Sequence, residues 1–309
     1  MLINPAAFRM RHRRRSTRMA QLIEGHGGRI YPASALDQMH GVLERILNDG
    51  VDRLVLAGGD GTLQGTVTYL ACRVPPDHRP DLVVLGGGRT NFVARDLGTR
   101  DQLVATLKRV LAAEHLQANK RRTLCLRHPG LPEQHGFFVA GGYIDRIIRH
   151  IHAWRAARSG WLHEGRFATQ FGLAALGMRR LLRANAPLPE LTVDAGELGS
   201  LAGPVSLLLL TTLTHADGGL DPYAQRGSGE VRLTAIRKGA SGFWTGLPAI
   251  ARGRFSARHA PAAGFLSGRC DRVVIHNLPG ISMDGQEFGL DPAVPLEITA
   301  GPNFNFLQP

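Results

Sequence analysis

The sequence predicts an α/β fold: an N-terminal Rossmann-like domain with an open, mostly parallel sheet, then a mainly antiparallel β-sandwich domain with inserted helices. Three observations carry this prediction. Apolar runs and helical patterns alternate up to about residue 115. Glycine-rich loops follow two of the apolar runs, where open α/β sheets place ligands. From residue 191 onward, short strands and turns dominate. We place the first domain at residues 1–115, with 296–309 returning to it, and the second at 116–295.

The alternation in the first half defines its elements. We expect strands at residues 1–3, 27–31, 54–57 and 81–85, and helices at 35–47, 63–69 and 103–114. Ser34 followed by Asp37 resembles a capping box that opens the first of these helices. The order of elements predicts parallel strands joined by helices, because such strands need a crossover connection.

The second half has a different pattern. We expect strands at residues 122–127, 135–140, 205–213, 230–236 and 272–277, with Leu296–Ala300 returning to the first domain as a last strand. A helical segment covers residues 144–183, with its helix from Arg146 and a break near Ser159–Gly160. Its isoleucines fall on one face and its arginines on the others. We favour a helix packed on its own domain; the alternative is a basic surface against anionic lipid.

The charge points to anionic partners. The 309 residues carry a net charge of +12 and a pI near 10.8, and arginine supplies nearly all of it. Such a surface attracts phosphates, anionic lipid headgroups or nucleic acid. Arg9 to Arg18 is a dense arginine run with two readings: a solvated loop and helix start, or a phosphate or headgroup contact beside the active site.

The remaining composition indicates a cytosolic protein. Cys72, Cys125 and Cys270 are odd in number and lack metal-ligand spacing, so we expect reduced thiols. We find no signal peptide and no apolar run long enough to span a bilayer. Any membrane association would therefore be peripheral.

The stretch Gly58-Gly59-Asp60-Gly61-Thr62 follows the apolar run from Leu54. A strand, a glycine loop and a helix start present backbone N–H groups to a phosphate. Glycine lets the backbone approach phosphate oxygens without a Cβ in the way. Asp60 could hold Mg²⁺, directly or through water. The stretch therefore predicts a nucleotide-phosphate site rather than an ordinary tight turn.

Three motifs in order extend this prediction. They are the Gly58–Thr62 stretch, the run from Gly87 to Gly98, and Met283-Asp284-Gly285-Gln286-Glu287. With the opening Asn4-Pro5, the chain resembles the diacylglycerol kinase catalytic-domain family over essentially its whole length. That family includes bacterial soluble lipid kinases, sphingosine kinases and ceramide kinases.

The resemblance implies a two-domain kinase that binds ATP and Mg²⁺ in the cleft between its domains. The implied metal ligand is Asp60, and the implied catalytic residues are Asp60, Asp284 and Glu287. The implied nucleotide-binding residues are Asn4, Pro5, Ala6, Ala7, Phe8, Ser34, Gly58, Gly59, Asp60, Gly61, Thr62, Leu63, Gln64, Arg89, Thr90 and Asn91. The implied partner is a lipid substrate at the anionic inner face of the cell membrane; no nucleic-acid partner is expected, and a homodimer is left open.

Four residues, at three places in the chain, depart from the family pattern. Gln286 stands where the family has the glutamate that acts as general base, so the proton must go to Asp284 or, after a shift by one residue, to Glu287. Arg89 replaces a threonine and either clamps a phosphate or points to solvent. Gln64-Gly65 replaces the usual Asn-Glu.

These departures leave alternatives beside the lipid kinase. An NAD kinase shares the first motif and can carry Asp-Gly-Gln late in the chain. A catalytically impaired nucleotide- or lipid-binding pseudokinase would also explain Gln286. The sequence favours an ATP-dependent lipid kinase acting on diacylglycerol, ceramide or a sphingoid lipid, and it does not choose among these acceptors.

Overall fold

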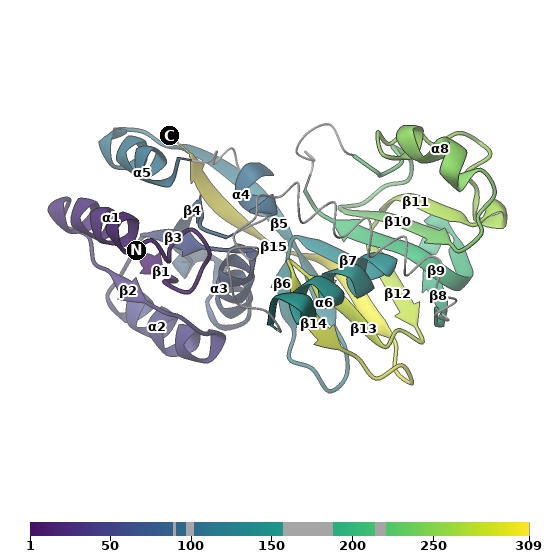
Figure 1. Ribbon diagram of the computed structural model, residues 1–309, viewed down its shortest axis with the longest axis horizontal. Helices are drawn as coiled ribbons and strands as arrows, with labels where there is room; N and C mark the ends of the chain where they lie inside the picture. The colour runs from purple at the N-terminus through teal and green to yellow at the C-terminus, as the bar shows by residue number, and fades with distance from the viewer. Residues whose placement is uncertain (89–90, 97–101, 157–187, 214–220, 309) are drawn as a thin grey trace.

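The computed structural model describes residues 1–88, 91–96, 102–156, 188–213 and 221–308. Figure 1 shows an N-terminal half with helices around a sheet beside a C-terminal half rich in strands, joined by the long strands β5 and β15. The helices are α1 (Arg13–Gly25), α2 (Leu36–Asn48), α3 (Asp60–Arg73), α4 (Phe92–Asp96), α5 (Leu103–Ala112), α6 (Tyr143–Ala156) and α8 (Phe243–Ile250). The strands are β1 (Leu2–Ile3), β2 (Tyr31–Pro32), β3 (Arg53–Gly58), β4 (Asp81–Gly86), β5 (Gln117–Arg127), β6 (Gln134–Gly136), β7 (Phe138–Gly142), β8 (Glu190–Asp194), β9 (Ser200–Thr211), β10 (Val231–Arg237), β11 (Phe265–Cys270), β12 (Arg272–His276), β13 (Gly280–Met283), β14 (Gln286–Gly289) and β15 (Leu296–Gln308).

The N-terminal strands are parallel, as the sequence predicts. The order β2-β1-β3-β4 is continuous, and β15 adds to β4 in parallel at Phe306 and Leu82. β3 and β4 are buried along nearly their whole length. A parallel strand whose two faces are both covered needs an unbroken apolar run. This run is the signal by which the sequence predicts both strands.

Alternate residues of β3 and β4 pack into two separate hydrophobic cores, one on each face of the sheet. Leu54 and Leu56 pack with apolar residues of α2 and α3 on one face. Val55 and Ala57 pack with apolar residues of α1 and α5 on the other. The helices therefore lie two to each face, and the carboxyl ends of β3 and β4 are left open at one edge.

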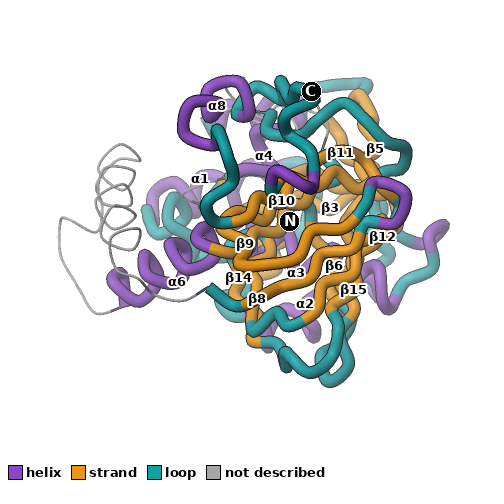
Figure 2. Tube along the Cα trace, turned by 90° about the vertical axis from the view of Figure 1, so that its right-hand side faces the viewer, coloured by secondary structure: helices purple, strands orange, loops and turns teal. Residues whose placement is uncertain are grey.

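The C-terminal half is mainly antiparallel. β9 lies at its centre and pairs antiparallel with β7, β8 and β10. Inward-facing side chains of these strands, among them Leu208, Leu210 and Leu233, form one large core with β12 and β13. In Figure 2, β8, β9 and β10 run across the face of this half. The predicted fold class, parallel strands first and antiparallel strands after them, is confirmed.

β15 joins the two halves, but not where the sequence suggested. Residues 296–299 pair antiparallel with β12, which is a strand of the C-terminal half, and not with a strand of the parallel sheet. After a register shift between Ala300 and Asn303, the strand continues along β5 and reaches β4 at Phe306. The prediction that Leu296–Ala300 is the returning strand is therefore wrong; the later residues return. The domain boundaries themselves stay a prediction.

Some local predictions also need correction. α2 begins after Ala35 without a side-chain cap, and the Ser34 N–H donates to Oε1 of Gln38, so the capping box is wrong. α3 begins at Asp60 rather than at Leu63. The strand predicted at 135–140 is divided at Phe137 into β6 and β7. Of the helix predicted at 146–183, residues up to 156 are helical; the break near Ser159–Gly160 lies outside the described residues.

Within the described part of the chain, we find no helix with the length and apolar character that crossing a membrane requires.

Candidate nucleotide-phosphate site

Two glycine loops meet at the carboxyl ends of β3 and β4. The Gly87 N–H donates to the Gly58 carbonyl oxygen at 2.7 Å. A Cβ on Gly88 would lie only 2.7 Å from the Cα of Gly59, so no other residue fits there without moving the backbone. The two loops therefore lie against each other beside the first turn of α3, which begins at Asp60. Helix N-termini with open space in front of them are suited to binding phosphate oxygens.

Asn91 holds the second loop in shape. Its buried side chain accepts from the Gly88 N–H at 2.7 Å and donates to the Gly88 carbonyl at 2.9 Å. Its backbone is left-handed, with φ 49°, a conformation that asparagine tolerates better than most residues. Asn91 therefore positions the loop through both of its amide atoms. Arg89 and Thr90, also predicted to bind nucleotide, lie outside the described residues.

The segment after β1 crosses the same edge. Asn4 donates from Nδ2 to Oγ1 of Thr62 at 3.0 Å and accepts from the Ala6 N–H at 3.0 Å. Further along, the Arg9 N–H donates to the Gly87 carbonyl at 2.8 Å. Pro5 and Ala6 are exposed, and Ala7 and Phe8 are half-buried. The segment from Asn4 to Arg9 thus contacts both motifs, and its role in nucleotide binding stays a prediction.

The third motif arrives on a hairpin. β13 and β14 pair at Met283 and Gln286, and the two residues between them have positive φ, 47° at Asp284 and 80° at Gly285. Two such residues form a type I′ turn, for which Asp-Gly is a preferred sequence. The turn explains why this motif is Asp-Gly and directs the Asp284 side chain inward.

Asp284 is a buried carboxylate with a raised pKa. Its oxygens accept from the N–H groups of Phe137 and Phe138, both at 2.9 Å. These two bonds explain the division between β6 and β7. Burial, followed by the negative charge of Asp60, raises the pKa of Asp284 to about 8 although both N–H bonds lower it. The repulsion shows that the first and third motifs bring their two acids close together.

Gln286 and Glu287 face opposite ways. The Gln286 amide donates from Nε2 to the Gly61 carbonyl at 3.4 Å, so it lies against the first turn of α3. Glu287 instead pairs with Arg149, with 3.4 Å between Nη1 and Oε2. Successive side chains of a strand alternate between faces, so a shift by one residue cannot bring Glu287 to the place of Gln286 while this register holds. The structure does not bring Glu287 together with Asp60 and Asp284.

Glu287 belongs to a network that sequence reasoning missed. Arg149 donates to Asp145 from Nε at 2.7 Å and to the carbonyls of Ile281 and Phe288, and Ser282 donates to Asp145 at 2.6 Å. The sequence predicts that Arg149 lies on a basic outer face of its helix. Its side chain instead bonds to the hairpin formed by β13 and β14. The Asp–Arg spacing of four residues was the available signal.

Other predicted residues face away from the open edge. Leu63 is buried in the core between the sheet, α2 and α3. Gln64 is also buried, and its Nε2 donates to Gln134 at 3.1 Å and to Thr68 at 3.2 Å. Their prediction as direct nucleotide contacts is corrected: both side chains connect α3 to its neighbours. Ser34 is exposed at the start of α2.

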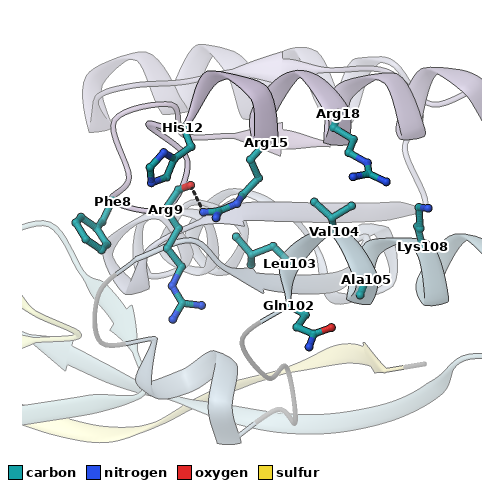
Figure 3. A pocket seen from close by; sticks show the side chains of 10 residues that line it. All are labelled: Phe8, Arg9, His12, Arg15, Arg18, Gln102, Leu103, Val104, Ala105 and Lys108. Carbon is teal, nitrogen blue, oxygen red and sulfur yellow. Dashed lines mark hydrogen bonds between the residues drawn. The ribbon is translucent and has the colours of Figure 1, made fainter. Parts of the chain in front are cut away.

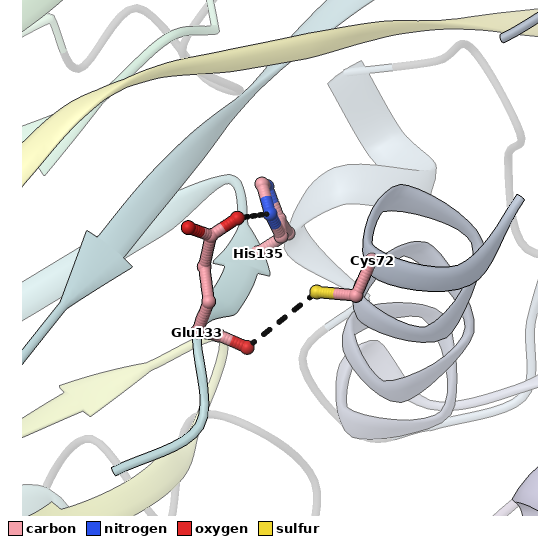
Figure 4. A group of neighbouring side chains, drawn as sticks. All are labelled: Cys72, Glu133 and His135. Carbon is pink, nitrogen blue, oxygen red and sulfur yellow. Dashed lines mark hydrogen bonds and ion pairs between the residues drawn. The ribbon is translucent and has the colours of Figure 1, made fainter. Parts of the chain in front are cut away.

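Two groups of side chains offer atoms that could bind a metal ion. Asp60 and Asp284 supply hard carboxylate oxygens, which Mg²⁺ prefers, and a cation between them would relieve their repulsion. Cys72, Glu133 and His135 form a second group whose ligand atoms all lie within 4.8 Å of one another (Figure 4). Sequence spacing gave no sign of it. Glu133, however, accepts from Arg127 at 2.6 Å and pairs with His135 at 2.8 Å, so the group is a hydrogen-bonded junction between α3 and β6.

The chain was compared with known proteins. Residues 1–122 match the sequence model of the diacylglycerol kinase catalytic domain. No curated protein matches the chain. A solved Bacillus anthracis protein, described as a candidate diacylglycerol kinase, is 15% identical with a TM-score of 0.67, covering 100% of this chain and 96% of that one. Another from the same organism, described as a diacylglycerol kinase, is 14% identical with a TM-score of 0.63, covering 100% and 95%. These structures share the fold of this chain, and the first 122 residues resemble the diacylglycerol kinase catalytic domain in sequence.

Proposed function

We propose that this protein is an ATP- and Mg²⁺-dependent lipid kinase that transfers the γ-phosphoryl group to a hydroxyl of a membrane lipid. The observation that carries the proposal is the position of Asp284, which the β13–β14 turn and the N–H groups of Phe137 and Phe138 hold near Asp60 at the glycine loops. The resemblance of residues 1–122 to a kinase catalytic domain supports the same activity. The acceptor we propose is diacylglycerol, ceramide or a sphingoid lipid.

The phosphates would lie against the first turn of α3. The N-cap of this helix is Gly59, which offers no side-chain cap, so no cap side chain competes with an anion for the N–H groups of the first turn. Thr62 is held by Asn4, and Gly88 by Asn91, so the loops around this helix end are fixed before a ligand binds. Fixed donors stabilise the charge of a transferring phosphoryl group at low reorganisation cost.

Mg²⁺ would be held by the carboxylate of Asp60. Bound there, the ion would neutralise charge on the nucleotide phosphates. Asp60 lies in the first turn of α3, where the chain bends from strand to helix. Asp284 is fixed by two backbone N–H groups. Asp60 therefore supplies the hard oxygen donor that the cation prefers, and Asp284 remains available to accept a proton.

Asp284 is the proposed proton acceptor. A carboxylate with a pKa near 8 takes a proton more readily than an ordinary aspartate does. In this role Asp284 would receive the proton of the lipid hydroxyl as its oxygen attacks the γ-phosphorus. Glu287 is less suited, because it faces Arg149. Gln286 cannot act as a base, but its amide orients the hairpin against Gly61.

A second function has its own support. Gln286 occupies the position beside Gly61 that the resemblance gives to a general base. A nucleotide- or lipid-binding protein without catalysis would keep the fold and lose this glutamate. The Gln286→Glu variant tests this: activity that appears only in the variant favours the binding protein, whereas activity in both favours the kinase.

We further propose that the protein acts peripherally at the inner face of the cell membrane. The net charge of +12 supports attraction to an anionic surface.

The test is incubation of purified protein with labelled ATP, Mg²⁺ and a panel of diacylglycerol, ceramide, sphingosine and NAD⁺. We expect label in one lipid and a loss of at least about a hundredfold in Asp284→Asn. Label in NAD⁺ alone would overturn the lipid assignment in favour of an NAD kinase. Bound ATP without transfer to any acceptor would overturn the catalytic assignment.

A further inference from the structure

A basic pocket lies between α1 and α5, on the face of the parallel sheet opposite α2 and α3. It has a volume of about 830 Å³. Its lining residues are Phe8, Arg9, His12, Arg15, Arg18, Gln102, Leu103, Val104, Ala105 and Lys108. Figure 3 shows the α1 side chains facing α5 across the pocket. Four of these ten described residues carry a formal positive charge, and none of the ten is acidic.

Three of the four cations of this pocket have no ion-pair partner among the described residues. Elsewhere in the described chain, arginines pair with carboxylates, as Arg121 does with Asp96 and Arg272 with Glu297. Within the described residues, Arg15, Arg18 and Lys108 form no such ion pair. Like charges gathered around one cavity repel each other, and an anion bound among them relieves that repulsion.

One cation is already oriented. Arg15 donates from Nη1 to the carbonyl oxygen of Arg9 at 2.7 Å, shown as a dashed line in Figure 3. This bond ties the helix side chain to the loop that carries Arg9. A guanidinium held in place loses less entropy when it binds, and its planar array of donors matches phosphate oxygens.

The backbone adds positive potential at the same place. His12 and Gln102 line the pocket and are the N-caps of α1 and α5; neither helix has a side-chain cap bond or an acid in its first turn. The partial positive ends of two helices therefore join the four side-chain cations. Phe8, Leu103 and Val104 supply apolar wall beside them. The cavity thus offers cations for a phosphate and an apolar wall for the organic group attached to it.

We propose that this pocket binds a phosphate monoester, carried either by a soluble metabolite or by a membrane lipid. The proposal goes beyond the kinase activity, because the pocket lies between α1 and α5; of its lining residues, Phe8 is the one that the resemblance also assigns to the nucleotide. The loop from Asn4 to His12 connects the two sites: Asn4 bonds to Thr62, and Arg9 lines the pocket.

The test compares two double variants that remove the same charge. Arg18→Gln with Lys108→Gln removes two pocket cations; both residues are exposed, so the fold should be kept. Arg13→Gln with Arg14→Gln removes two exposed charges of α1 that do not line the pocket. Binding of inorganic phosphate and glycerol phosphate is measured by calorimetry. Flotation is measured with phosphatidylcholine vesicles containing phosphatidic acid, or phosphatidylserine at matched surface charge.

We expect the pocket variant to bind about tenfold more weakly than the parent, and the α1 variant to stay within about twofold. Binding of the soluble phosphates identifies a metabolite site. Flotation with phosphatidic acid but not phosphatidylserine, without soluble binding, identifies a lipid phosphate. Equal weakening in both variants would show general surface attraction and overturn the proposal. So would no binding by the parent protein, or binding that neither variant weakens, since phosphate would then be held elsewhere.

Discussion

The carboxylate of Asp284 fills the space in which a side chain at position 136 would begin. A Cβ built on Gly136 would lie 2.5 Å from Oδ2 of Asp284 and 2.7 Å from Met283. Asp284 cannot retreat easily, because both of its oxygens accept backbone N–H groups and Met283 is buried in the C-terminal core. A glycine just before Phe137 is therefore required for the hairpin to bring its acid to the site.

Gly136→Ala should accordingly destabilise the protein by about 1–3 kcal/mol, the usual cost of forcing extra volume into a packed interior. Chemical denaturation measures the change. Gly41→Ala is the matched control: Gly41 lies in α2 with nothing within 4 Å of its added Cβ. The control should gain about 0.5–1 kcal/mol from helix propensity. Equal stability changes in both variants would contradict the packing argument.

The raised pKa of Asp284 predicts how stability depends on pH. An unfolded aspartate titrates near pH 3.9, roughly, whereas folded Asp284 has a pKa of about 8. Between these values the folded state binds the extra proton, so the contribution of Asp284 to the free energy of unfolding falls as pH rises from about 4 to about 8 and is constant above.

Asp284→Asn removes this titration while keeping a residue that tolerates φ 47°. We subtract the free energy of unfolding of the variant from that of the parent, both without divalent metal. This difference should fall as pH rises from about 4 to about 8. Denaturation at several pH values, with EDTA present, provides the measurement. A difference that does not change with pH would mean that the folded pKa is not raised.

Glu287 and Asp284 should respond differently to neutralisation. Glu287→Gln removes a partly exposed ion pair to Arg149, which is worth less than about 1 kcal/mol. Its turnover should stay within a few-fold of the parent, while Asp284→Asn loses at least about a hundredfold. Steady-state kinetics, with the lipid that the parent protein phosphorylates, measures the turnover of both variants. A collapse of turnover in Glu287→Gln would restore the shifted-base hypothesis.

Asn91→Ala should destabilise the loop that follows β4. The change removes two hydrogen bonds to Gly88 and places alanine at φ 49°, so we expect a loss of about 2–4 kcal/mol. Asn277→Ala is the control, since exposed Asn277 has a similar φ of 61°. It should lose about 1 kcal/mol from the backbone conformation alone. Thermal unfolding with and without ATP compares the two, and similar losses would mean that the Asn91 side chain does not hold the loop.

Much of the fold was predictable because its signals are local. β3 and β4 are unbroken apolar runs, since both of their faces are covered, and each is followed by glycines that a close approach requires. The Asp-Gly of the hairpin is likewise local, because a type I′ turn demands residues that accept positive φ. From these segments the sequence by itself determined the order of strands, the two glycine loops and the residues that meet at them.

Only the tertiary structure decided which neighbours those residues face. Gln286 lies against Gly61 and Glu287 against Arg149, because pairing with β13 fixes the register, and one residue of slip would exchange them. Gln64 lies just after the first motif, yet its side chain turns inward to Gln134, 70 residues away in the chain. Contacts between distant segments depend on how the two halves pack, and a single sequence carries no local signal for them.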